Sequence, residues 1–126
     1  MRHQKNQSKL GMPSDARVAL VRNQTAMLFE HGYINTTLQR ARAVRQLAEH
    51  LITFAKRGDL SSIRVCASQL PTKGNLRALL RKVAPANAEV ASGYTQIAKL
   101  GYRRGDGAER VRLSIRKYLA EEAPKS

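Results

Sequence analysis

The strongest structural signal in this chain is the stretch Ser92–Lys117, SGYTQIAKLGYRRGDGAERVRLSIRK. In its second half the apolar residues Val111, Leu113 and Ile115 alternate with polar ones, and this period of two predicts a strand with one buried and one exposed face. The polar positions are Arg110, Arg112, Ser114 and Arg116. The first half, residues 94–102, is β-prone but less regular. We therefore expect two antiparallel strands joined by Arg103–Gly107, a loop whose two glycines and aspartate are typical of a longer hairpin connection.

The sequence before this stretch predicts helices, beginning at Pro13-Ser14-Asp15, where Ser14 or Asp15 is placed to cap the first one. Gly32 is placed to end that helix. The short β-prone segment 33–37 is predicted to join the later pair of strands. The expected buried stripe of the first helix is Val18, Val21, Thr25 and Leu28.

Three further helices are predicted between residues 37 and 85. Thr37 is a candidate cap for the first of them, which runs to about Arg57, and Asp59 is a candidate cap for the next, which Pro71 stops. Pro85 closes the last. The expected buried faces are Val44, Leu47, Ala48, Leu51, Ile52 and Ala55; then Leu60, Ile63, Ala67 and Leu70; then Leu76, Leu79, Leu80 and Val83. Arg42, Arg45, Gln46, Glu49, Thr53 and Lys56 are expected on the opposite face of the second helix.

This order of helix, strand, three helices and two strands predicts a two-layer α+β domain, with a small sheet covered by helices on one face. We expect a basic N-terminal arm over residues 1–13, one α+β RNA-binding domain over 14–117, and a flexible C-terminal tail over 118–126. Cys66 is expected to be a small buried or half-buried residue.

The charge of the chain points to an anionic partner. The sequence has 23 Lys+Arg against 9 Asp+Glu, a formal net charge of +14, and a phosphate backbone is the most common polyanion for such an excess. An anionic membrane surface is the competing partner, but no apolar run approaches the roughly 18 residues of a spanning helix. The polar amino terminus argues against a secretory signal. The single Cys66 excludes an internal disulfide, and no Cys/His grouping has the spacing of a zinc site.

Several segments together resemble one known family. Met1-Arg2-His3, Arg22-Asn23, residues 34–38 (INTTL), Ala41-Arg42 and residues 51–56 (LITFAK) occur in this order, followed by residues 93–99 (GYTQIAK) and 103–108 (RRGDGA). Their order and spacing closely resemble the bacterial large-subunit ribosomal protein L17 family, over nearly the whole chain. The resemblance implies the fold given above and no catalysis. It also implies a structural role: binding of large-subunit ribosomal RNA near the polypeptide exit region, beside other large-subunit proteins.

The resemblance also marks departures from the family pattern. Family members usually carry additional basic residues where this chain has Gln4, Ser8, Met12 and Ala16, a glycine at Ser92 and a basic residue at Gln96. In the resembling proteins the N-terminal arm lies against RNA, so Arg2, His3, Lys5 and Lys9 are candidate contacts. We expect the arm of this chain to hold RNA less strongly than the arm of its relatives.

The remaining candidate RNA contacts are mostly arginines. Arg103 and Arg104 on the loop are expected to bind phosphates, with a solvated basic loop as the alternative. Arg110, Arg112 and Arg116 share a strand face, where like charges side by side favour an opposing anion or simple solvation. Arg17 and Arg22 are further candidates, and for Arg17 pairing with Asp15 is the alternative. Arg40, Arg42 and Arg45 lie near a helix start, where Arg45 can instead pair with Glu49. The last candidates are Tyr94, Thr95 and Lys99.

Base stacking by Tyr94 and Tyr102 is one possibility, and core packing with the hydroxyl at the edge is the other. An enzyme is not expected: His3, His31 and His50 are scattered, and no carboxylate or thiol lies at a suggestive spacing. We expect no metal, cofactor or small-molecule substrate and no membrane contact.

The sequence thus predicts a structural, RNA-binding protein of the large ribosomal subunit. An off-ribosome regulator that binds RNA or protein with the same fold is the alternative, and a nuclease would require clustered metal ligands or a His pair. The lack of an Arg/Ser-rich presequence favours a cytoplasmic bacterial ribosome over an organellar one.

Overall fold

The computed structural model of the chain describes residues 14–91 and 93–118. The predicted arm, residues 1–13, and residues 119–126 of the predicted tail lie outside the described residues. Along the described part the order is α1 (Ser14–His31), β1 (Tyr33–Thr37), α2 (Leu38–Arg57), α3 (Leu60–Gln69), α4 (Lys73–Ala78), η2 (Leu79–Val83), β2 (Thr95–Tyr102) and β3 (Glu109–Ile115). The π-helical turn η2 continues α4 directly. The predicted α+β class and element order are confirmed.

The sheet is built around β3. Within the described residues it has three strands in the order β1–β3–β2, and β3 pairs antiparallel with both neighbours. Leu113 lies opposite Ile34 on one side and Ile97 on the other. Because side chains alternate across a strand, this register places the apolar residues of all three strands on the same face. Segment 33–37 therefore joins the later pair, as the sequence predicts.

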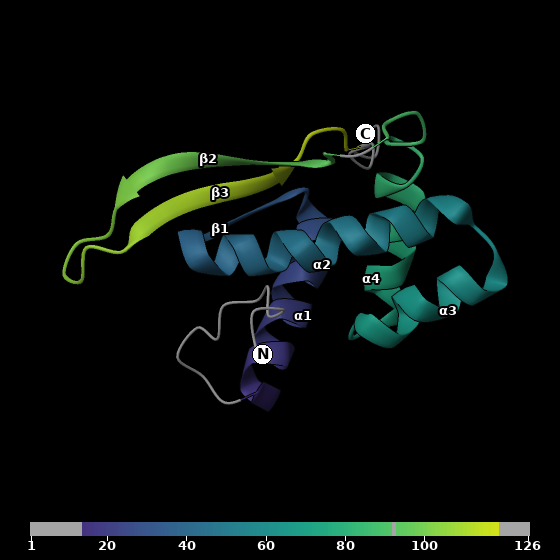
Figure 1. Cartoon of the computed structure of the whole chain (residues 1–126), viewed down its shortest axis with the longest axis horizontal. Helices are drawn as coiled ribbons and strands as arrows, with labels where there is room; N and C mark the ends of the chain where they lie inside the picture. The colour runs from purple at the N-terminus through teal and green to yellow at the C-terminus, as the bar shows by residue number, and fades with distance from the viewer. Residues whose placement is uncertain (1–13, 92, 119–126) are drawn as a thin grey trace, which may run out of the picture.

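Helix α2 covers the apolar face of the sheet (Figure 1). Its buried side chains are Ala41, Val44, Ala48, Leu51, Ile52 and Ala55. Five of these were predicted from the 3.6-residue period; the sixth expected residue, Leu47, is only half-buried. Helix α1 crosses α2, while α3 and α4 lie at the end of α2 away from the hairpin tip (Figure 1).

The predicted stripe of α3 is correct at Leu70, which is buried, and wrong at Leu60 and Ala67, while Ile63 is half-buried. Leu60 is 63% exposed and Ala67 is also exposed, whereas Ser62 and Cys66 are buried. The helix carries apolar residues on several sides, so its own pattern does not determine which side packs. The turn at Gly58, whose φ of 73° is left-handed, brings α3 back against α2. There the Cys66 thiol lies 3.6 Å from the Leu51 carbonyl oxygen. Cys66 is buried, as expected.

The predicted stripe of α1 is correct at one end only. Thr25 and Leu28 are buried, but Val18 is 43% exposed and Val21 is half-buried. Phe29, which the stripe omitted, is fully buried. The buried residues of α1 all lie in its second half, so the same helical stripe runs out of the core towards its N-terminal end.

The predicted caps of α2 and α3 are in the right places but do not cap with their side chains, whereas Ser14 and Asp15, the candidates for α1, both lie inside that helix. Thr37 and Asp59 occupy the positions before α2 and α3, and neither side chain bonds to the helix backbone. The Asp59 carboxylate accepts a hydrogen bond from the Ser61 hydroxyl instead, at 2.8 Å. At α4, in contrast, Thr72 does cap the helix with its side chain, and it exchanges hydrogen bonds with Asn75.

Tyr118 belongs to the folded domain and not to the tail. Its hydroxyl lies 2.6 Å from the carbonyl oxygen of Phe29 and 2.7 Å from that of Glu30. Its half-buried ring packs close to Gly32, where φ is +88° and a Cβ would collide with the ring. The carbonyl groups at the end of α1 thus hold the chain one residue beyond the predicted boundary.

Phe29→Ala is expected to lower the free energy of unfolding by about 3–5 kcal/mol, because it removes a fully buried ring from the core. Urea unfolding followed by circular dichroism measures the change. Met27→Ala is the matched control, since Met27 lies on the same helix and is 49% exposed. Its expected effect is below about 1 kcal/mol. Equal losses in the two variants would contradict this account of the core.

Candidate nucleic-acid interface

One face of the sheet is not covered by any of the described helices, and this uncovered face carries a row of arginines. The register places Arg110 beside Thr37 and Gly101, and Arg112 beside Asn35 and Ala98. Each arginine therefore has small or neutral neighbours across both strand pairs, and the side chains of Arg110, Arg112 and Arg116 are exposed. The result is a cationic surface with small or neutral side chains between the arginines. An anion on this surface meets no carboxylate from the neighbouring strands.

Arg112 is the most firmly oriented of these cations. Its guanidinium carbon lies 4.5 Å from the centroid of the Tyr33 ring, and its Nε donates to Asn35 Oδ1 at 3.0 Å. These contacts use one flat side of the guanidinium and its Nε, and neither uses the terminal amino groups. An arginine held in this way loses little conformational freedom on binding a phosphate. Tyr33 and Asn35 were not among the sequence candidates, because their role depends on a cross-strand register that sequence spacing does not give.

The hairpin extends beyond the helical layer (Figure 1), and its tip is closed by an internal ion pair. Arg103 Nε donates to Asp106 Oδ1 at 3.0 Å, and its Nη2 pairs with Oδ2. Asp106 Oδ1 also accepts from the Ala108 amide at 3.1 Å. Backbone bonds from the Arg103 amide to the Ala108 oxygen (2.7 Å) and from the Gly107 amide to the Arg103 oxygen (3.0 Å) complete the turn. We call this arrangement the tip clamp.

The tip clamp changes the roles of the two predicted tip arginines. Both arginines are exposed, but the guanidinium of Arg103 is engaged by Asp106 within the loop. The hydrogen bond from Arg103, followed by that from the Ala108 amide, holds the pKa of Asp106 well below its ordinary value. The same bond raises the pKa of Arg103. From the sequence, Asp106 was expected only as a loop residue, although an aspartate three residues after an arginine in a short loop is a signal for such a pair.

Two further side chains stand out on the hairpin. Lys99 forms an ion pair with Glu109 at 3.3 Å, so part of its charge is balanced within the protein. Tyr102 is 76% exposed near the tip. The register shifts between Lys99 and Gly101, leaving Leu100 as an extra residue. Because the Tyr102 ring is so exposed, it is accessible for the stacking on an RNA base that was considered from the sequence.

The expectation that Tyr94 and Thr95 contact RNA does not fit the structure, in which they are 2% and 3% exposed. The Tyr94 hydroxyl lies 3.1 Å from Lys56 Nζ and 3.2 Å from the Ala91 oxygen. The Thr95 hydroxyl donates to Glu49 Oε2 at 2.6 Å, and its amide donates to the same oxygen at 3.2 Å. Tyr94 thus follows the core-packing alternative. Glu49 and Lys56, expected on the exposed face of α2, are half-buried because they bind the start of β2.

The other predicted basic contacts lie on α2, on α1 and outside the described residues. Arg40, Arg42 and Arg45 are exposed along the first turns of α2, and Arg40 shares a hollow of about 430 Å³ with Ala108 and Glu109 at the start of β3. Arg17 and Arg22 lie on α1, where Arg22 Nε donates to Gln69 Oε1 at 3.1 Å. Arg2, His3, Lys5 and Lys9 lie outside the described residues. The arginines of the sheet, of the tip and of the α2 start therefore form the candidate interface, and Arg17 and Arg22 line a separate hollow between α1 and α2.

The described residues hold no group of three or more His, Cys, Asp or Glu side chains placed to bind a metal ion. In the same part of the chain, none of the helices has the length and apolar character needed to cross a bilayer. The fold and this surface together define the class: a small basic α+β domain that displays arginines on an open sheet and a projecting hairpin.

Comparison with known proteins gives the family. A family model described as Ribosomal protein L17 matches residues 20–116. The large ribosomal subunit protein bL17 of Clostridium kluyveri is 47% identical over 107 residues, covering 85% of this chain and 95% of that protein. The protein of the same name from Finegoldia magna is 42% identical over 118 residues, covering 94% and 90%. The chain belongs to the ribosomal protein L17 family, a family of structural and non-enzymatic ribosomal proteins.

Arg103→Gln is expected to raise the pKa of Asp106 towards the ordinary aspartate value of about 3.9, because it removes the guanidinium that stabilises the carboxylate. Carboxyl-carbon NMR titration from pH 6 downward measures this. Since the pKa is lowered in the folded chain, the tip clamp is complete above the ordinary aspartate pKa and is lost only as the pH falls through the lowered one. Arg104→Gln removes the same charge and leaves the clamp intact, so a shift of equal size in both variants would contradict the assignment.

Proposed function

We propose that this protein is a structural constituent of the large ribosomal subunit and that it stabilises large-subunit ribosomal RNA through phosphate contacts. The relatives of this chain are named as proteins of that subunit. The observation that carries the proposal is the row of arginines on the uncovered sheet face, which neutral residues flank on both sides. Such a row is electrostatically unfavourable in a free protein and becomes favourable against a polyanion.

The proposed contact set is centred on the hairpin. Alternate residues of β3 point to the same face and are roughly 7 Å apart along the strand, so they can contact successive groups of a phosphate backbone. The proposed phosphate contacts are Arg104, Arg110, Arg112 and Arg116, with Arg40, Arg42, Arg45 and Lys99 at the margin. Arg103 acts through the tip clamp by fixing the loop that carries Arg104.

The family resemblance supports three finer parts of the proposal. Arg2, His3, Lys5 and Lys9 of the N-terminal arm contact RNA in addition to the sheet. The protein lies near the polypeptide exit region beside other large-subunit proteins. It acts in the ribosomes of a bacterial cytoplasm, as expected for a chain whose matched relatives come from bacteria.

Replacing a phosphate-binding arginine is expected to weaken binding to large-subunit RNA fragments and to flatten its salt dependence. A plot of the logarithm of the binding constant against the logarithm of the salt concentration has a negative slope. Arg110→Gln and Arg112→Gln should each make this slope less steep by about 0.7–0.9, as for one lost phosphate contact. Filter binding or fluorescence anisotropy across a salt series measures the slope. Arg64→Gln is the control with the same charge change, since Arg64 is exposed on α3. Equal slopes for all three variants would refute the proposed contact set.

Co-sedimentation tests the assignment to the subunit. The protein is expected to remain with large subunits after washing in a salt concentration that removes loosely bound proteins. Its absence from washed subunits would reject the structural role and favour an off-ribosome regulator that uses the same fold.

A further inference from the structure

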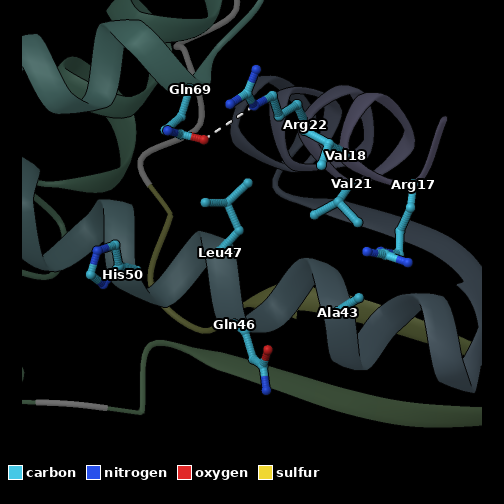
Figure 2. A pocket seen from close by; sticks show the side chains of 9 residues that line it. All are labelled: Arg17, Val18, Val21, Arg22, Ala43, Gln46, Leu47, His50 and Gln69. Atoms are coloured by element: carbon cyan, nitrogen blue, oxygen red, sulfur yellow. Dashed lines mark hydrogen bonds between the residues drawn. The ribbon is translucent and has the colours of Figure 1, made fainter. Parts of the chain in front are cut away.

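A groove of about 350 Å³ lies between α1 and α2 (Figure 2), and its described lining includes none of the arginines of the sheet. Val18 and Val21 of α1 form one wall, and Ala43 and Leu47 of α2 form the other. Val21 and Leu47 point towards one another across the groove (Figure 2). Arg17 and Arg22 flank the valines on α1. The groove is therefore an aliphatic cleft with a cationic edge.

The aliphatic walls of the groove are the ends of two helical apolar stripes, one on α1 and one on α2, whose other residues are buried in the core. On α1 the stripe is fully buried at Thr25 and Leu28, half-buried at Val21, and 43% exposed at Val18. On α2, Val44 and Ala48 are buried, whereas Leu47 is only half-buried. Aliphatic residues at helical spacing are typical of a face that packs against something. At this end of the two helices, the described residues leave the face partly uncovered.

The edge of the groove favours an acidic occupant. The described residues that line it include the arginines Arg17 and Arg22 together with His50, and no carboxylate is among them. Gln69 holds Arg22 by a 3.1 Å hydrogen bond, which fixes the guanidinium at the edge. A second copy of this chain is an unfavourable occupant, because each copy has a net charge of +14.

RNA is also a poor match for this groove. Phosphates need cations and hydrogen-bond donors, and gain nothing from valine and leucine walls. Unstacked bases are usually bound on aromatic rings or on guanidinium planes. The lining does include the His50 ring and the guanidiniums of Arg17 and Arg22, but Arg22 is already held by Gln69, and the facing walls are the aliphatic side chains of Val18, Val21, Ala43 and Leu47.

We infer that the groove binds a segment of a neighbouring protein, which places an aliphatic side chain between Val18 and Leu47 and a carboxylate beside Arg17. The inference rests on the proposed function in one respect: the neighbour is another protein of the same subunit. It assigns Arg17 and Arg22 to a protein contact, in place of the RNA contact expected from the sequence. The protein would then hold RNA with its sheet and a protein partner with its helices.

Photo-crosslinking in assembled subunits tests the occupant. The full chain carries p-benzoylphenylalanine in place of Val18, or in place of Met27 as the control. Met27 is an exposed residue nine positions along α1, on the opposite side of that helix. Washed large subunits are irradiated and the adducts are mapped by mass spectrometry. We expect the Val18 probe to give an adduct with one large-subunit protein, in a segment with an aliphatic residue next to Asp or Glu, and the Met27 probe not to give it.

Each other outcome overturns the inference. These outcomes are an adduct with RNA, with residues 1–13 of the chain itself or with a second copy, the same protein adduct from both probes, or no adduct in subunits that contain the chain. Failure of the chain to incorporate at all has a different meaning. It rejects the proposed function, and with it the inference that depends on it.

A pair of charge-matched variants gives an independent readout. Val18→Asp is expected to lower retention of the protein in washed subunits by at least tenfold relative to Val65→Asp, because it opposes the partner's carboxylate within the groove. Val65 is exposed on α3 and lies outside the groove. Both variants should bind isolated large-subunit RNA fragments within about twofold of one another, since their net charge is equal. Equal retention of the two variants, or a selective loss of RNA affinity in Val18→Asp, would refute protein docking at this site.

Discussion

The packing of α2 against β3 is the contact on which the other features of this protein depend. Val111 and Leu113 are fully buried under α2, while Arg110 and Arg112, their neighbours in the sequence, face the other way. One strand is thus both the centre of the core and the centre of the cationic surface. A slip of one residue in the register would place arginines in the core, so the burial of the aliphatic residues fixes the direction of the charges. The flanking strands hold this register from both sides.

Internal pairing divides the cations into two groups. Arg103 closes the hairpin tip with Asp106, Lys99 pairs with Glu109, and Lys56 bonds to the Tyr94 hydroxyl at the start of β2. These cations shape the sheet and its loop. The arginines of the uncovered face have neutral neighbours across the strands instead, and Arg112 is held by an aromatic ring and an amide, which orient it without neutralising it. Such an arrangement preserves the charge for an external anion.

The two surfaces of the domain differ in chemistry as well as in position. The sheet and hairpin carry arginines among small and neutral residues, which suits a phosphate backbone. The groove between α1 and α2 has aliphatic walls and a cationic edge, which suits a polypeptide. Because the helices that form the groove also cover the sheet, the core fixes the two surfaces relative to one another. A protein of this kind is well built to join RNA and a second protein in an assembly.

The sequence alone determined the α+β class, the element order, the five correctly predicted buried positions of α2 and the two faces of β3, because a regular hydrophobic period is a local property of the chain. The motifs it carries also gave the family. Tertiary contacts decided the rest: α3 packs through Cys66 and not through Leu60, Tyr94 and Thr95 are withdrawn into contacts with Lys56 and Glu49, and Arg103 is engaged by Asp106. They also left Val18 at the edge of a groove and set Arg112 against Tyr33. Which face of a mixed helix is covered, and which partner a polar side chain finds, depends on residues distant in the sequence, whose approach no local pattern records.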